Sequence, residues 1–151
     1  MDKQPVLIIC YGDTLHGDDG LGWHVADQMA RRVPPDEVLV IACRQLTPDL
    51  AESVRDAQAV ILVDAAPGET PGRITCHQVV CENGSNPASK QQLTPGELLA
   101  YTRALYGTAP PMWVWTITGE SFEACDELSP VVQDAVLALV QILTDQVAVP
   151  A

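Results

Sequence analysis

The residues with the clearest potential for chemistry lie in a short acidic loop near the N-terminus. The stretch GDTLHGDDGLG, residues 12–22, holds Asp13, Asp18, Asp19 and His16 among four glycines. Crowded carboxylates bind hard or borderline metal ions, and they also shift one another's pKa toward values that suit acid–base chemistry. The glycines allow the backbone to bend back on itself. The loop therefore predicts a cation-binding or acid–base site.

A second candidate acid, Asp64, follows another apolar run in the segment AVILVDAA, residues 59–66. In open α/β sheets, sites form beyond the carboxyl ends of the strands. If the strands that precede the acidic loop and Asp64 lie close together in a parallel sheet, their carboxylates face one crevice. We expect such a crevice to be the functional site.

Two other interpretations of the acidic loop stay open at this point. A glycine-rich turn between a strand and a helix also occurs in dinucleotide-binding sites. Here the glycines do not follow the G-x-G-x-x-G spacing, and the aspartates would repel a pyrophosphate. Alternatively, Asp18 or Asp19 caps the following helix, which is a common role of aspartate. Capping by one of the two leaves the other, and Asp64, unexplained.

The elements around these residues are expected in the order β-α-β-α-β-β-α-β-α. Short apolar runs indicate strands at 5–12, 37–43, 59–66, 72–80 and 111–119. Helical patterns occupy 21–33, 47–57, 94–107 and 129–143, and 81–92 has the composition of a loop. We therefore predict an α/β fold, a three-layer sandwich with a mostly parallel five-stranded twisted sheet flanked by helices, as a single domain over 1–151.

Three of the predicted helices carry recognisable end signals. Thr94 is followed by Glu97 at the spacing of a capping box, and Gly107 is placed to end the same helix. Thr47 and Ser129 each precede a proline, so both are expected to be N-caps.

Composition narrows the classes of partner. Acidic residues outnumber basic ones 20 to 8, and the net charge of −12 would repel a nucleic-acid backbone or an anionic membrane. No apolar run approaches the ~20 residues that cross a bilayer, and the N-terminus lacks signal-peptide features, so we expect a cytoplasmic protein. The odd number of cysteines, 5, without a C-x-x-C pair argues against a disulfide framework or a structural zinc site.

Three segments resemble a known family. The stretch ICYGDTLHGDDGLGWHVAD (9–27) resembles the N-terminal motif of the hydrogenase maturation proteases, G-x-G-[ND]-x-L-x-x-D-[DE]-G-x-G. The segment 61–74 is similar to their strand–acid–turn–strand unit, and 119–136 to their C-terminal loop and helix. The segment CRQLTPDLAESV (43–54) is similar to the subset that serves soluble, bidirectional NAD-linked hydrogenases. At the unspecified second position of this motif, between Cys10 and Gly12, Tyr11 replaces the small residue that is usual in the family.

This resemblance implies a hydrolase, an endopeptidase that removes the C-terminal extension of a nickel-loaded [NiFe] hydrogenase large-subunit precursor. It implies that Asp19 and Asp64 are the catalytic residues and ligands of nickel that the substrate carries and the free enzyme binds weakly. Gln91 occupies the position of the family's third ligand, a histidine. An amide oxygen is a weaker nickel ligand than imidazole, and His16 is an alternative donor. A non-catalytic metal- or nucleotide-binding module, or an assembly chaperone of the same fold, is the alternative function.

Overall fold

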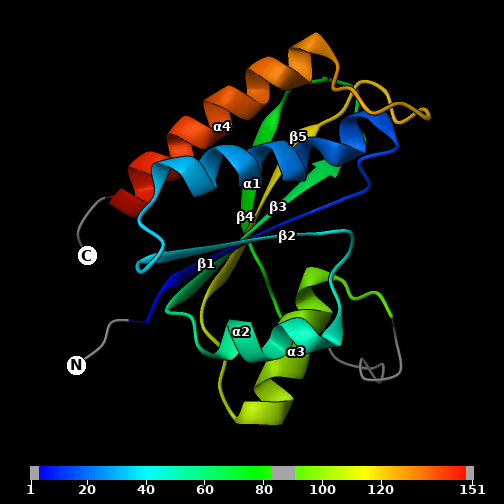
Figure 1. Cartoon of the computed structure of the whole chain (residues 1–151). Helices are drawn as coiled ribbons and strands as arrows, with labels where there is room; N and C mark the ends of the chain where they lie inside the picture. The colour runs from blue at the N-terminus through cyan, green and yellow to red at the C-terminus, as the bar shows by residue number, and fades with distance from the viewer. Residues whose placement is uncertain (1–3, 83–90, 149–151) are drawn as a thin grey trace.

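The computed structural model describes residues 4–82 and 91–148 of the chain, so most of the predicted loop 81–92 lies outside the described residues. A five-stranded sheet with the strand order β2-β1-β3-β5-β4 is its central layer (Figure 1). The strands are β1 (Val6–Tyr11), β2 (Val38–Cys43), β3 (Ala59–Ala66), β4 (Ile74–Gln78) and β5 (Met112–Thr118). Neighbouring strands are parallel except β4, which is an antiparallel edge strand beside β5.

Helices cover both faces of this sheet. On one face lie α1 (Leu21–Arg32) and α4 (Pro130–Ala148), and on the other lie α2 (Ala51–Arg55) and α3 (Pro95–Tyr106) (Figure 1). Two 3₁₀ turns, η1 (Gly17–Gly20) and η2 (Pro48–Leu50), precede α1 and α2. The predicted three-layer α/β fold with a mostly parallel sheet is confirmed. No helix within residues 4–82 and 91–148 has the length and apolar character that crossing a bilayer requires.

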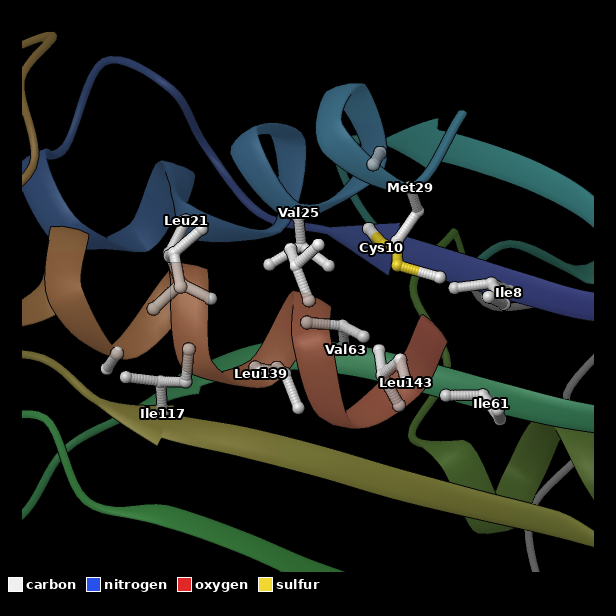
Figure 2. Close-up of a cluster of buried hydrophobic side chains, with 14 of the residues drawn as sticks. Ile8, Cys10, Leu21, Val25, Met29, Ile61, Val63, Ile117, Leu139 and Leu143 are labelled. Atoms are coloured by element: carbon white, nitrogen blue, oxygen red, sulfur yellow. The ribbon is translucent and has the colours of Figure 1, made fainter. Parts of the chain in front are cut away.

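Burial on both faces explains why the strands are unbroken apolar runs. On β1, Ile8 and Cys10 pack toward α1 and α4, whereas Leu7 and Ile9 pack toward α2 and α3. Figure 2 shows the first of these two clusters, in which side chains from α1 and α4 meet those of β1, β3 and β5. Each fully buried aliphatic side chain contributes about 1.5–3 kcal/mol, so these two layers fix the strand positions.

The helix-end predictions had mixed outcomes. The capping box is confirmed, because the backbone N–H of Glu97 donates to the Thr94 hydroxyl and the Glu97 carboxylate accepts from the Thr94 N–H. Gly107 ends α3 in the left-handed region, at φ 81°, as predicted. Thr47 is the N-cap residue of η2 with a proline after it, as predicted, but its hydroxyl donates to the Asp49 carboxylate and forms no side-chain cap. The expected single helix is instead η2 followed by α2.

Candidate active site

A row of side chains crosses the carboxyl ends of the central strands. The strand register places four residues in it, one each on β2, β1, β3 and β5: Cys43, Tyr11, Asp64 and Thr116. Residues that share a row point to the same face of a sheet. Tyr11 and Cys43 pack against the apolar cluster under α2 and α3, so the row lies on that face.

Asp64 is half-buried in this row, and its surroundings change its proton affinity. Burial raises the pKa of Asp64 to about 6, against a hydrogen bond from the backbone N–H of Ala65. The nearby Asp19 carboxylate raises this pKa further, and a hydrogen bond from the Tyr11 hydroxyl lowers it. Asp64 therefore exchanges its proton close to neutral pH, as a general base must.

Tyr11 is a site residue that the sequence analysis did not assign. Burial and the Asp64 charge raise the pKa of its phenol well above the usual range, so the hydroxyl stays protonated and donates to Asp64. The only signal in the sequence was the departure from the small residue of the family motif. Its partner depends on β1 lying beside β3, which no local pattern reveals.

Asp19 comes from η1 and lies close enough to Asp64 for its charge to act on that carboxyl. The backbone N–H of Asp13 donates to Asp19 Oδ2 at 2.8 Å. Within the described ranges no donor contacts Asp19 Oδ1, so this oxygen is available to a ligand. The structure thus brings Asp19 and Asp64 together at one end of the sheet, as the strand topology led us to expect.

A glycine is required where β1 leads into this loop. Gly12 has φ 151°, and a Cβ atom there would lie 2.0 Å from the backbone oxygen of Asp19. The indole N–H of Trp23 donates to the Gly12 oxygen at 2.9 Å and ties the loop to α1. The backbone of the acidic loop therefore folds against its own beginning and positions Asp19.

Asp18 has a different role from its neighbour, because its side chain is fully buried. Its Oδ2 accepts hydrogen bonds from the N–H groups of Glu120 and Ser121 and from the hydroxyl of Ser129, and its Oδ1 accepts from the Ser129 N–H, at 2.7–2.9 Å. Burial acts to raise the pKa of Asp18, but these hydrogen bonds outweigh it and hold that pKa below its usual range. Asp18 thus joins the acidic loop to the loop between β5 and α4.

The capping interpretations of these residues had different outcomes. Neither Asp18 nor Asp19 caps α1, whose N-cap is Gly20 without a side-chain hydrogen bond. Ser129 stands directly before α4 as predicted, and its carbonyl accepts from the N–H groups of residues 132 and 133. Its hydroxyl makes no side-chain cap and donates to Asp18 instead.

The His16 side chain contacts Asp13, and no described hydrogen bond or ion pair joins it to Asp19 or Asp64. Its Nδ1 lies 2.9 Å from Asp13 Oδ2, which Arg44 also contacts at 3.2 Å. A hydrogen bond from the Leu15 N–H, and then the His16 and Arg44 side chains, lower the pKa of Asp13. The suggestion that His16 replaces the missing histidine ligand therefore finds no support in these contacts.

Gln91 is exposed in the turn before α3. The Gln45 amide donates to its backbone oxygen at 3.5 Å, and the Leu93 N–H donates to Leu46 at 2.9 Å. These bonds place the turn beside the loop that follows β2, but none joins the Gln91 side chain to Asp19 or Asp64. Residues 4–82 and 91–148 contain no group of three or more His, Cys, Asp or Glu arranged to hold a metal ion.

Several solved structures have a similar fold. A [NiFe] hydrogenase maturation protease, HycI, from Thermococcus kodakarensis has a TM-score of 0.75 at 19% identity, covering 96% of this chain and 93% of its own. The fold is that of the hydrogenase maturation peptidases.

Two further structures agree. The hydrogenase maturating endopeptidase HybD of Escherichia coli has a TM-score of 0.74 at 18% identity, covering 92% of this chain and 89% of its own. A hydrogenase 2 maturation peptidase from a Thaumarchaeota archaeon has a TM-score of 0.71 at 21% identity, covering 97% and 99%. No protein family model and no curated protein matches the sequence. At this identity the likeness is one of fold.

Proposed function

We propose that this protein is a hydrogenase maturation protease, an endopeptidase that removes the C-terminal extension of a [NiFe] hydrogenase large-subunit precursor. The observation that carries the proposal is the pairing of Asp19 and Asp64 at the carboxyl ends of the sheet, in a fold shared with hydrogenase maturation peptidases. The resemblance of segment 43–54 favours a soluble, bidirectional NAD-linked hydrogenase as the source of the substrate.

The nickel belongs to the substrate in this proposal. Carboxylate oxygens are acceptable ligands for borderline divalent ions, and Asp19 Oδ1 and Asp64 offer two of them at one place. Two carboxylates and an exposed amide, Gln91, form a weak set of ligands by themselves. They suit an ion that the precursor already holds with its own donors. The enzyme would then bind productively only to a precursor that has been loaded with nickel.

The two carboxylates have different proton chemistry. Asp19 Oδ2 is occupied by the Asp13 N–H, so Asp19 is suited to binding and orientation. Asp64, with its pKa near 6, can bind through one oxygen and accept a proton from the attacking water at the other. Water adds to the scissile carbonyl, its proton passes to Asp64, and Asp64 returns the proton to the departing amide nitrogen. The Tyr11 hydroxyl orients the Asp64 carboxylate.

The decisive test uses the precursor in nickel-loaded and nickel-free forms. Incubation with the wild-type protein should shorten only the loaded form, measured as loss of the C-terminal peptide in the intact mass. Asp19→Asn and Asp64→Asn should each stop this loss. Asp134→Asn, which removes an exposed carboxylate on α4, is the matched control and should cleave normally.

The outcomes separate function from mechanism. Failure of the wild-type protein to shorten any loaded large subunit would refute the function. Cleavage at the wild-type rate by both site variants would refute the carboxylate mechanism while leaving the function intact. Stable binding of the precursor without cleavage would favour an assembly chaperone. That alternative arises because Gln91 occupies the position of the family's histidine ligand.

A further inference from the structure

A second feature of the same sheet edge is a cavity of about 360 Å³ beside the candidate active site. The lining residues that matter here are Glu69, Arg73, Thr75, Thr116 and Thr118. Thr116 is the register partner of Asp64, and Thr75 is the register partner of Thr116. The cavity therefore continues the row that contains Asp64 across β5 and β4 to the edge of the sheet.

Arg73 is the cation of this cavity, and its guanidinium has no hydrogen bond or ion pair with any described residue. Its backbone is fixed, because its N–H donates to Thr70 and its oxygen accepts from Thr118. Arg31, Arg44 and Arg55 each lie within 3.2 Å of a carboxylate, whereas Arg103 has no described side-chain partner either but lies outside this cavity. What distinguishes Arg73 is an exposed guanidinium, unpaired among the described residues, at a cavity wall, where a carboxylate is its natural partner.

The remaining lining suits a peptide backbone. Threonine hydroxyls can both donate and accept, so they can pair with the N–H and C=O groups of an extended segment. Thr75 and Thr116 already share a hydrogen bond across β4 and β5, which holds both hydroxyls at the cavity wall. Glu69, also at the lining, adds a negative charge that opposes an anionic ligand, so binding of a carboxylate here would depend on Arg73.

We propose that this cavity holds the residues that follow the scissile bond, and that Arg73 binds a carboxylate of that segment. The inference rests on the proposed function. The nickel-bearing body of the precursor must lie over Asp19 and Asp64, so the extension has to leave along the surface beside them. The extension ends in an α-carboxylate, and an acidic side chain within it offers the same chemistry.

The sheet geometry predicts where this carboxylate lies. Two strand spacings of about 4.8 Å and two residues of about 3.3 Å along the strand separate the Asp64 and Arg73 backbones by about 12 Å. An extended chain advances about 3.3–3.6 Å per residue, so about three or four residues cover this span. We therefore expect the recognised carboxylate within about five residues of the scissile bond, allowing for the reach of the arginine side chain.

The test measures binding and cleavage separately. The probe is a synthetic peptide with the sequence of the precursor's C-terminal extension, prepared as the free acid, as the C-terminal amide, and with its acidic side chains changed to amides. Binding is followed by the Arg73 Nε–H signal and the Thr118 backbone amide signal in ¹H–¹⁵N spectra. Cleavage of the nickel-loaded precursor gives kcat and KM.

Arg73→Gln should weaken peptide binding and raise KM by at least about tenfold with little change in kcat, because a charge-assisted contact is lost away from the reacting atoms. Arg73→Lys should retain part of the affinity. Arg103→Gln is the control, since it removes an exposed arginine in the last turn of α3, toward the other end of the strands. Weaker binding of the C-terminal amide would identify the α-carboxylate as the group that Arg73 binds. Weaker binding of the peptide with amidated side chains would identify an acidic side chain as that group.

Wild-type affinity and wild-type KM in Arg73→Gln would overturn the inference while the proposed protease function stands. Arg73-dependent binding of the peptide by a protein that cleaves nothing would instead refute the proposed function and leave the carboxylate site.

Discussion

Asp64 occupies a half-buried position at the end of β3, where ionisation of its carboxylate costs free energy. The folded protein binds the Asp64 proton more tightly than the unfolded chain, because the pKa rises from 3.8 to about 6. The stability that this proton contributes is fully present below pH 3.8 and is lost as the pH rises through 6. At neutral pH the fold thus holds a charged group that its surroundings disfavour, as is common at functional sites.

We predict from this that Asp64→Asn stabilises the protein at pH 7 by about 1–3 kcal/mol while it abolishes cleavage. The difference between variant and wild type should be small at pH 4 and should grow up to pH 7. Urea unfolding at both pH values measures it. Equal stabilities of wild type and variant at pH 7 and at pH 4 would show that Asp64 does not titrate as described.

Asp18 behaves in the opposite way, because its carboxylate is buried with four hydrogen-bond donors around it. Asp18→Asn should destabilise the protein by about 2–4 kcal/mol at pH 7, since an amide cannot accept from all these donors. The lowered pKa gives a stability contribution that is present above the unfolded pKa and lost as the pH falls. The difference in the free energy of unfolding between variant and wild type should therefore decrease as the pH falls.

The control for Asp18→Asn is Asp126→Asn, which changes an exposed aspartate in the loop between β5 and α4. This variant should unfold like the wild type at every pH. A similar loss of stability in both variants would mean that the loop, and not the Asp18 carboxylate, determines the effect.

At the scale of elements, the turn from β1 into the acidic loop depends on Gly12. Gly12→Ala should cost more than about 3 kcal/mol and should displace Asp19, because the added Cβ would overlap the Asp19 backbone oxygen. Gly107→Ala is the matched control: Gly107 also has a positive φ, of 81°, but nothing lies within 4 Å of its Cβ position. This control should lose only about 1 kcal/mol. Thermal unfolding measures the stability of both variants. Equal losses of stability would contradict the close approach of Gly12 to the Asp19 backbone oxygen.

The turn before α3 offers a test of the third proposed ligand. Gln91→His should tighten binding of Ni²⁺ to the free protein by at least about tenfold, because imidazole is the stronger ligand. Calorimetric titration measures it, with Gln92→His as the neighbouring control. Unchanged affinity in Gln91→His, or an equal gain in the control, would show that position 91 does not face the ion.

How far the sequence could predict these elements depends on the distance between partners. The capping box of Thr94 and Glu97 was predictable because its two residues lie three positions apart at the first turn of one helix. The role of Asp18 was not, since its partners are 102 to 111 residues away in the sequence. Asp64 could be placed from the end of an apolar run, whereas its contact with Tyr11 needed the order of the strands. The free guanidinium of Arg73 likewise depends on how β4 returns beside β5.

At the scale of the whole molecule, the parallel strands bring the ends of β1 and β3 together, and the helices on both faces hold them there. This arrangement places the carboxylates of Asp19 and Asp64 next to a cavity that leads toward the edge strand β4. The proposed function requires both carboxylates to act on the same nickel ion, which another protein carries.

Single-turnover cleavage of the nickel-loaded precursor by the wild type, Asp19→Asn, Asp64→Asn and the double variant tests this claim most directly. Residues that act as one unit lose their effect together, so each single variant should be slower by at least about 100-fold. The double variant should then be little slower than the poorer single variant. A wild-type rate in either single variant, or losses in the two that simply multiply in the double, would contradict the claim.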